Sequence, residues 1–296
     1  MTSTASTADK PPLQSSVDTL LENSIKDIGI PPRPAILDRI SNEMLKEEPD
    51  FKRLAKIIGA DVSLAASLIK TANSPFFGCR IRVRSINEAL MVLGLDVSSR
   101  AIAGIILRKV FPHSLHLERF WDASARIARL SGWLTQQIGN NKLRPDDAYT
   151  YGLFRDCGIP VLLMRFPDYD KILDRANGEE SLSFTAVEDS KLPTNHAKVG
   201  CLLAQSWWLP EETCLAIRHH HDAAIIETPA ITPPLTARYR IAMAQFAEHL
   251  VQRHSGLSHT CEWPKLGAAC LHLLDIAEND VDDIFAGAVP VMDAED

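Results

Sequence analysis

The chain has 296 residues, of which 46% are hydrophobic and 23% are charged. That hydrophobic content is enough to bury a core, so the composition excludes a wholly disordered or fibrous chain. The formal net charge of −7 argues against broad attraction to nucleic acid or to an anionic membrane, and neither is expected as a partner.

Features that would direct the chain to a membrane or out of the cell are not evident. The longest apolar run that stands out, "AIAGIIL" at 101–107, is shorter than the ~18 residues that a membrane span needs. Residues 1–15 lack an apolar centre, so we expect a disordered leader rather than a secretory signal. The six cysteines form no CxxC pair, which favours a reducing compartment. We therefore expect a cytoplasmic protein.

Residues 16–112 are predicted to form an N-terminal bundle of about five short helices. Asp61 is a good N-cap for one of them, and Ser85 with Glu88 has the spacing of a capping box for another. Apolar residues recur at three- and four-residue intervals through 34–45, 51–60, 61–74, 85–94 and 95–110.

Longer helices follow, and residues 113–288 are predicted to form a second, larger helical subdomain. The stretch 117–139 is long enough for about six helical turns. Residues 289–296 are predicted to be an acidic tail, in which "MDAED" at 292–296 is a frayed end. Two-residue alternation appears only in "CRIRVRSI" at 79–86, so the predicted fold class is all-α, with the N-terminal bundle packed on the larger helical core.

The stretch "AIRHHHDAA" at 216–224 is a candidate metal site. Neighbouring residues on a helix point about 100° apart, so the three histidines cannot all reach one ion. The remaining ligands would have to come from elsewhere, and His196 and Asp156 are the candidates. Structural histidines at a helix end explain the run equally well, because imidazolium suits the C-terminal dipole.

Several motifs in order resemble the HDOD family, whose members are signalling-output domains related to the HD phosphohydrolases. The resemblance covers roughly residues 25–252. It is carried by "IPPRPAILDRI", "SLIKTANSPFFG", "SINEALMVLGLD", "FWDASARIA", "YGLFRDCGIPVLL", "NHAKVGCLLAQSWWLPEETCLAIRHHHD" and "RIAMAQFAEHL". It implies a bacterial regulatory module whose larger subdomain has an HD-like fold.

The resemblance also identifies the positions that hold metal in active HD enzymes. Those enzymes use an early histidine, a His-Asp dyad, further histidines and a late aspartate. In this chain the early histidine is replaced by Ala123, the dyad histidine by Arg155 and the late aspartate by Gln245. Three positions match as histidines and one as an aspartate: Asp156, His196, His220 and His221.

The substitution of Arg155 for the dyad histidine decides the expected chemistry. A guanidinium is always protonated at physiological pH, so it offers no lone pair and repels a divalent ion. We expect an ion pair between Arg155 and Asp156, no catalytic residue, no cofactor and no bound metal. If a metal is held, Asp156, His196, His220 and His221 are its predicted ligands.

Two further features were weighed as binding sites. Arg80, Arg82 and Arg84 alternate on an extended segment and form a candidate anion-binding patch, with Lys70 and Arg100 on nearby helices. A solvated loop around buried Ile81 and Val83 is the simpler interpretation. In the pair Trp207–Trp208, one ring is expected to anchor the core and the other to be partly exposed.

The sequence therefore predicts a non-catalytic signalling module. It would bind a protein partner, or a nucleotide second messenger, through the N-terminal bundle and the former catalytic cleft. Two alternatives remain open: a divergent metal-dependent phosphohydrolase that uses the surviving Asp and His ligands, and a nucleic-acid-binding regulator that uses the arginine segment. Bound metal together with hydrolysis would favour the phosphohydrolase. A nucleic-acid affinity that falls steeply with salt would favour the nucleic-acid-binding regulator.

Overall fold

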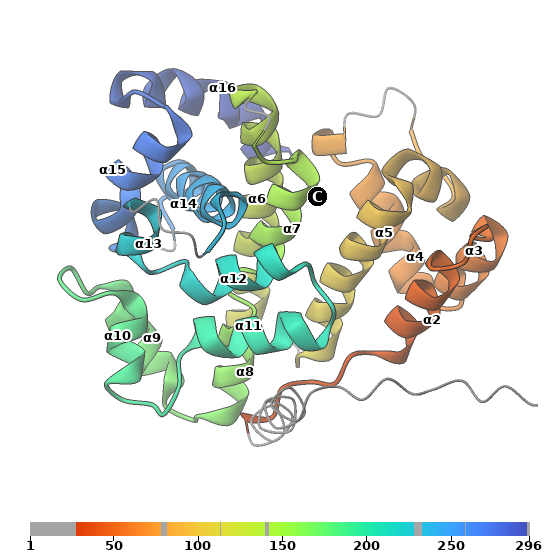
Figure 1. The fold of residues 1–296 in the computed structure, drawn as a ribbon, viewed down its shortest axis with the longest axis horizontal. Helices are drawn as coiled ribbons and strands as arrows, with labels where there is room; N and C mark the ends of the chain where they lie inside the picture. The colour runs from red at the N-terminus through yellow and green to blue at the C-terminus, as the bar shows by residue number, and fades with distance from the viewer. Residues whose placement is uncertain are drawn as a thin grey trace, which may run out of the picture.

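The computed structural model describes residues 28–77, 82–112, 114–139, 142–227, 233–257 and 259–294. Within these ranges every regular element is a helix and no strand occurs, which confirms the all-α prediction (Figure 1). The N-terminal helices and the larger helical core lie side by side, and the chain passes from one to the other near residue 112.

Among the described residues before 112, the N-terminal group has four α-helices and a short 3-10 turn, and side chains cap three of these helices. Asp50 accepts hydrogen bonds from two backbone N–H groups at the start of α3, and Asp61 and Ser85 cap α4 and α5 in the same way. The elements are α2 (Ala35–Met44), α3 (Phe51–Gly59), α4 (Val62–Ala72), η1 (Pro75–Phe77) and α5 (Ile86–Val110).

Helix α5 joins two segments that the sequence analysis treated as separate helices. Gly94 has a φ of 73° and a ψ of 165°, which are not helical values, so α5 consists of two helices that meet at a kink there, as the separate stretches 85–94 and 95–110 predict. As one element, α5 is long and apolar enough to cross a membrane by length and composition, although no uninterrupted apolar run of that length is evident in the sequence. Forty-four per cent of that window is buried inside the protein, and a core helix passes the same test.

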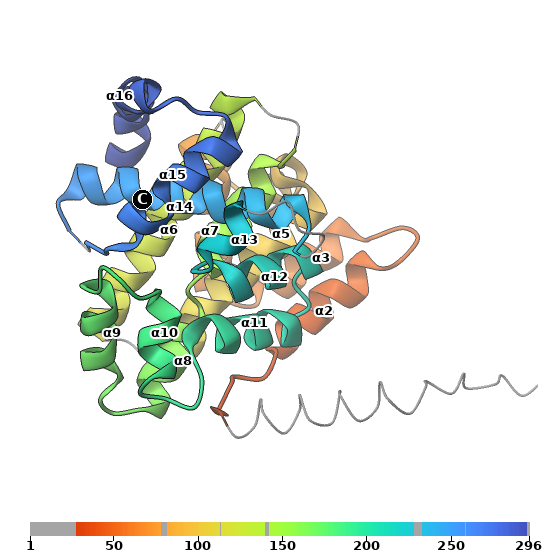
Figure 2. The ribbon, with the colours of Figure 1, turned by 60° about the vertical axis from the view of Figure 1, so that its left-hand side comes forward.

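The larger core is built around α14, which is buried along most of its length and packs against α6, α12 and α15. The core helices are α6 (Leu115–Ile138), α7 (Pro145–Phe154), α8 (Gly158–Arg165), α9 (Tyr169–Asn177), α10 (Phe184–Asp189), α11 (His196–Ser206), α12 (Glu211–His219), α13 (Ala223–Glu227), α14 (Leu235–Ser255), α15 (Glu262–Leu274), η2 (Glu278–Asp280) and α16 (Val281–Asp293). Figure 2 shows α11 and α12 lying across the front of this core, below α13 and α14.

The predicted acidic tail is largely helical. Helix α16 continues to Asp293, and Ala288 and Met292 are buried against the core, because apolar residues line one side of this segment despite its acidic end. The prediction of a frayed end at 292–296 is therefore wrong for 292–293, while 295–296 lie outside the described residues.

Two groups of contacts join the N-terminal helices to the core. Arg100 on α5 forms ion pairs with Asp146 and Asp147 on α7, so it belongs to this junction and not to an anion-binding patch. Trp207 is 2% exposed and donates from its indole nitrogen to the carbonyl of Pro31. Trp208 is 66% exposed, which confirms the division of roles expected for the two rings.

Candidate functional site

The turn between α7 and α8, together with the close contact between α8 and α11, brings Arg155 and Asp156 next to His196. Arg155 and Asp156 lie between α7 and α8, and α8 begins at Gly158. A Cβ at Gly158 would lie 2.0 Å from the carbonyl oxygen of His196, so only glycine permits α8 and α11 to approach this closely. This packing places Asp156 beside the start of α11.

The three histidines stand at helix ends that point to the same place. His196 is the first residue of α11, where Asn195 is the N-cap. His220 and His221 follow the last residue of α12, His219, and the Nε2 atoms of both approach His196. His219 lies outside this group, so only two adjacent histidines of the run converge, which agrees with the limit that helix geometry sets.

Four donor atoms converge in this cluster, which we call the His/Asp cluster (Asp156, His196, His220 and His221). The Nε2 atom of His196 lies 3.1 Å from the Nε2 atoms of both His220 and His221. The Oδ1 atom of Asp156 lies 3.1 Å from Nε2 of His220 and 3.7 Å from Nε2 of His196. All four donor atoms lie within 4.8 Å of one another.

The second nitrogen of each imidazole faces an oxygen acceptor outside the cluster. Nδ1 of His196 lies 2.7 Å from Oε2 of Glu188, and Nδ1 of His220 lies 2.7 Å from the carbonyl of Ile217. Nδ1 of His221 contacts the Glu262 carboxylate. These partners favour the tautomer with the proton on Nδ1, which leaves three Nε2 lone pairs directed at each other.

The facing Nε2 lone pairs of the three imidazoles repel one another unless a positive charge lies between them. Either a proton or a metal ion can supply that charge. Burial alone would lower the pKa of His196, but the Glu188 carboxylate raises it above its ordinary value. Burial and the neighbouring His220 lower the pKa of His221 to about 3, so this imidazole stays neutral. A single proton on His196 is one way to satisfy the cluster.

A single divalent ion is the other way, and the donor set fits it. Ligand atoms of a tetrahedral ion at 2.0–2.1 Å lie about 3.3 Å apart. Four of the six separations in the cluster are 3.1, 3.1, 3.1 and 3.7 Å, and none of the six exceeds 4.8 Å. Outer partners such as Glu188 and Glu262 also orient the imidazoles as they do in metal sites. The structure thus assembles the four ligands that the resemblance named for a residual site.

The guanidinium of Arg155 lies beside this cluster and forms the expected ion pair. Nε of Arg155 lies 2.8 Å from Oδ2 of Asp156, and Nη2 lies 2.7 Å from Oε1 of Glu248. Burial alone would lower the pKa of Arg155, but the two carboxylates outweigh it and raise that pKa. The same guanidinium, helped by His220, holds the pKa of Asp156 well below its usual range although burial opposes this.

Glu248 changes the interpretation of the late acidic position. Gln245, which the resemblance aligned with the lost aspartate, is buried on α14 and donates to Oε2 of Glu248 at 3.2 Å. The negative charge expected to be missing is therefore supplied one helical turn later. Ala123 lines a cavity of about 350 Å³ together with Glu248, and its methyl side chain contributes no ligand.

A larger cavity opens on the other side of the cluster. His221 lines a space of about 620 Å³ whose other lining residues include Lys198, Arg218 and Lys265. Asp222, which follows the histidine pair, also lines it and is exposed. The cluster is otherwise enclosed, since the side chains of His196 and His220 are 0% and 2% exposed.

The arginine segment takes no part in this site. Arg80 lies outside the described residues, while Arg82 and Arg84 are exposed. Val83 between them is buried, and its backbone exchanges two hydrogen bonds of 2.8 Å with the Asn73 side chain. This arrangement fits the solvated loop around a buried residue.

Sequence reasoning missed the three glutamates that surround the cluster. Glu188 is fully buried and also accepts from the Tyr169 hydroxyl at 2.5 Å. Glu248 and Glu262 are 8% and 2% exposed. The local sequence does not mark them, since Asp189 follows Glu188 and the polar stretch 258–260 precedes Glu262.

Comparison with known proteins identifies the family. The HDOD domain matches residues 30–223. A protein from Treponema pallidum (strain Nichols), described as an uncharacterized protein, is 28% identical over 210 residues, which are 69% of this chain and 40% of that protein. This chain therefore spans less than half the length of that relative.

Solved structures share the fold. A crystal structure described as an HDOD domain protein with unknown function, from Geobacter sulfurreducens, has a TM-score of 0.64 at 24% identity and covers 93% of this chain and 97% of that one. One from Shewanella amazonensis SB2B, described as a "Putative phosphohydrolase", has a TM-score of 0.65 at 18% identity and covers 90% and 94%. At these identities the likeness concerns the fold alone.

Proposed function

Because the chain belongs to the HDOD family, we propose that it is a non-catalytic signalling or regulatory module. It binds a protein partner or a nucleotide second messenger through its N-terminal helices and the former catalytic cleft. It acts in the cytoplasm, without a membrane or nucleic acid as partner.

The observation that carries this proposal is the position of the Arg155 guanidinium. It lies between the carboxylates of Asp156 and Glu248, with 6% of its side chain exposed. A guanidinium there supplies a fixed positive charge beside the His/Asp cluster, so a second divalent ion is repelled. We therefore expect this chain to lack the two-ion site with which some hydrolases stabilise the attacking and leaving oxygens.

A hydrolysis assay on tag-free protein tests the proposal. Phosphodiester and phosphomonoester substrates are incubated with the protein in Mn²⁺, Mg²⁺ or Zn²⁺, with a chelator-treated sample and a His220→Ala variant as controls. We expect no turnover above the His220→Ala background. Turnover that a chelator abolishes and that disappears in His220→Ala would show that the protein is a metal-dependent phosphohydrolase, and the non-catalytic proposal would fail.

A divergent metal-dependent phosphohydrolase is the second candidate, and the His/Asp cluster supports it. Asp156, His196, His220 and His221 would hold one ion, and an ion of this kind lowers the pKa of a coordinated water. Lys198, Arg218 and Lys265 line the adjacent cavity, where Lys198 pairs with Asp189 and Lys265 with Glu262, so Arg218 is the cation that best suits a phosphate group. The relative described as a "Putative phosphohydrolase" has the same fold. The assay above separates the two candidates.

A further inference from the structure

Helix α11 ends in a turn whose left-handed position glycine usually occupies. The N–H of Trp208 donates to the carbonyl of Gln205 at 3.0 Å, and the N–H of Leu209 donates to the carbonyl of Ala204 at 3.0 Å. These two hydrogen bonds form a Schellman motif, in which the residue after the C-cap adopts a left-handed conformation. Trp208 holds that position, and its φ is 62°.

A tryptophan at this position costs backbone strain. A left-handed backbone brings Cβ too close to a carbonyl oxygen, so glycine adopts it best. Helices α6 and α14 accordingly end on Gly139 and Gly256, with φ values of 66° and 65°. The other non-glycine residue with positive φ in the described part of the chain is Asp275, a residue type that tolerates this conformation. Strained residues of this kind cluster at functional sites.

The indole of Trp208 is also held in one place. The guanidinium carbon of Arg33 lies 4.1 Å from the centroid of the ring. Arg33 is itself fixed, because its Nε donates to the carbonyl of Trp207 at 3.2 Å. Its Nη2 donates to the Ser41 hydroxyl at 2.7 Å, and its Nη1 pairs with Asp38. Trp208 nevertheless is 66% exposed, and a rigid, exposed aromatic side chain is pre-organised to anchor a partner.

A cleft of about 310 Å³ opens beside Trp208, between the N-terminal helices and the core. Leu45, the C-cap residue of α2, lines this cleft and is 81% exposed. Met44, Phe154 and Pro210 contribute further apolar surface. The volume is at the lower end of the range of about 300–1,000 Å³ that holds small molecules, so the cleft suits an apolar side chain of a partner. We call it the Trp208 cleft.

The charges around the Trp208 cleft favour a basic partner. Arg33 and Arg100 line the cleft, but both are already paired with aspartates. Glu211 and Glu212 follow Pro210 at the start of α12, and neither forms an ion pair with a described residue. The unpaired charge at this rim is therefore negative, and lysine or arginine side chains of a partner would complement it.

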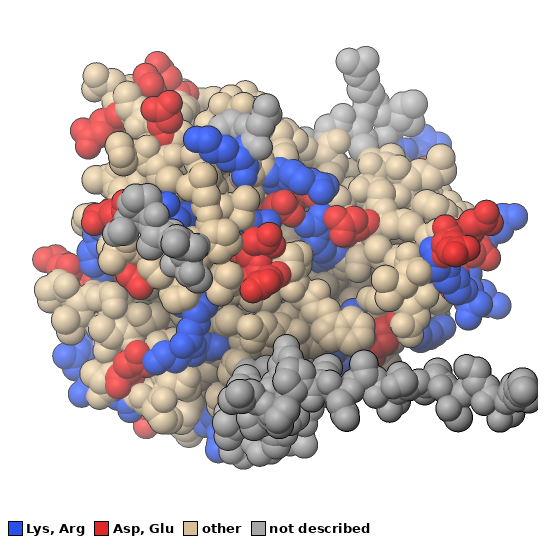
Figure 3. Space-filling view, viewed as in Figure 1, with Lys and Arg blue, Asp and Glu red and all other residues tan. Residues whose placement is uncertain are grey.

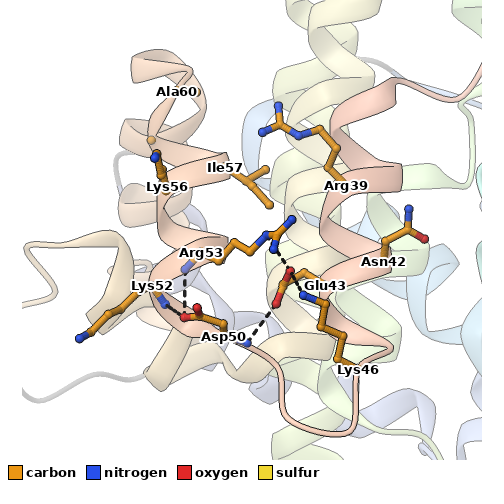
Figure 4. Close-up of a pocket in the computed structure, with 11 residues that line it drawn as sticks. Arg39, Asn42, Glu43, Lys46, Asp50, Lys52, Arg53, Lys56, Ile57 and Ala60 are labelled. Carbon is orange, nitrogen blue, oxygen red and sulfur yellow. Dashed lines mark hydrogen bonds and ion pairs between the residues drawn. The ribbon is translucent and has the colours of Figure 1, made fainter.

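A different face of α2 has the opposite charge. A groove of about 1,130 Å³ between α2 and α3 carries five cations against two carboxylates, Glu43 and Asp50 (Figure 4). The cations are Arg39, Lys46, Lys52, Arg53 and Lys56. Figure 3 shows basic side chains projecting among carboxylates at this end of the molecule. A basic partner is therefore repelled by this groove and directed to the Trp208 cleft.

We propose that the Trp208 cleft binds a basic, amphipathic segment of a partner protein. An aliphatic side chain of the segment enters the cleft beside Trp208 and Leu45, and its basic residues face Glu211 and Glu212. This inference rests on the proposed function, because it names the surface that binds the protein partner and the chemistry of that partner. It does not depend on the His/Asp cluster, which contributes no residue to the cleft.

A leucine/lysine peptide is the probe for this surface. It is a labelled peptide of about 14 residues with leucine at helical spacing and lysine elsewhere, and a leucine/glutamate peptide with the same leucines is its control. Fluorescence anisotropy measures binding to the full chain at about 0.15 M salt, which screens charges more than about 8 Å apart. We expect the leucine/lysine peptide to bind at least about tenfold more tightly than the control.

Replacement of Trp208 separates a binding role from a structural one. Trp208→Gly should weaken binding of the leucine/lysine peptide by at least about tenfold, because it removes the aromatic anchor. The same change should not lower the urea midpoint of unfolding, since glycine adopts this φ without strain. Leu45→Ala should weaken binding by about threefold. Val62→Ala, at an equally exposed residue on α4, should change it by less than about twofold.

The proposal is overturned if the leucine/lysine peptide does not bind at about 1 mM, or if Trp208→Gly binds it as well as the unaltered chain does. Sedimentation velocity tests a second copy of the chain as the occupant, and a dimer that Trp208→Gly dissociates would also overturn the proposal. His220→Ala should bind the peptide normally. Metal-dependent turnover would therefore refute the proposed function alone, and absence of peptide binding would refute this inference alone.

Discussion

The Nη2 atom of Arg155 lies 2.7 Å from the Oε1 atom of Glu248, which joins the end of α7 to the buried helix α14. The same guanidinium also pairs with Asp156. One cation therefore balances two carboxylates inside the core, beside the three histidines. A charge of this kind stabilises the protein mainly by preventing the carboxylates from being left unpaired.

We expect Arg155→Met to be strongly destabilising for that reason. The change leaves Asp156 and Glu248 buried without their cation, and removal of one partner from a buried ion pair costs about 3–5 kcal/mol. Arg253→Met is the matched control, because Arg253 pairs with Asp282 on the surface and should cost below about 1 kcal/mol. Urea unfolding measures both values, and equal losses would remove the structural role assigned to Arg155.

We expect tag-free protein to take up no more than one Zn²⁺ per chain at the His/Asp cluster, and no pair of ions. Four donors converge there, while the Arg155 guanidinium repels a second ion. His220→Gln should lower the zinc affinity by about 100-fold or more, because it removes a ligand. His254→Gln, at a partly exposed histidine outside the cluster, should leave zinc affinity unchanged. Mass spectrometry of the native protein counts the ions, and two per chain would contradict the assignment.

The carboxyl group of Glu179 gives a pH-dependent prediction. Hydrogen bonds from the Ser181 hydroxyl and from the backbone at Ser181 and Leu182 lower its pKa from 4.5 to about 2. A depressed folded-state pKa contributes stability above the unfolded pKa, and that contribution is lost as the pH falls from about 4.5 towards 2.

Replacement of the hydroxyl partner should reverse part of this shift. In Ser181→Ala the pKa of Glu179 should rise towards 4.5, as a carbon-13 NMR titration of the side-chain carboxyl would measure. Ser206→Ala, which removes a hydroxyl at the end of α11, should leave the Glu179 titration where it is. An unchanged pKa in Ser181→Ala would show that the backbone donors alone set it.

The contact between α8 and α11 predicts an effect of Gly158→Ala. The added Cβ would lie 2.0 Å from the His196 carbonyl, so the helices must move apart, which costs about 3 kcal/mol or more. Gly178→Ala is the control, because its Cβ would meet no atom closer than 3.8 Å, and it should cost below about 1 kcal/mol. Thermal unfolding compares the two, and a tolerated Gly158→Ala would refute this packing argument.

The sequence by itself determined the helical architecture and most helix starts. Apolar spacing is a local property, and Asp61 and Ser85 cap α4 and α5 where their side chains predict. The motif order was also enough to identify the family. The break at Gly94 within α5 also follows from the sequence, because glycine suits the positive φ at a helix end. The helical C-terminal segment was missed, because its acidic residues indicated an exposed end.

Only the tertiary structure decided how the site is built. The resemblance named Asp156, His196, His220 and His221, but their convergence depends on how α8, α11 and α12 pack and on where α12 ends. The glutamates that orient or balance them, Glu188, Glu248 and Glu262, come from three further helices. Periodicity along a helix fixes which residues face inward, but it carries no information about which inward-facing residues of different helices meet. That information exists only once the helices are packed.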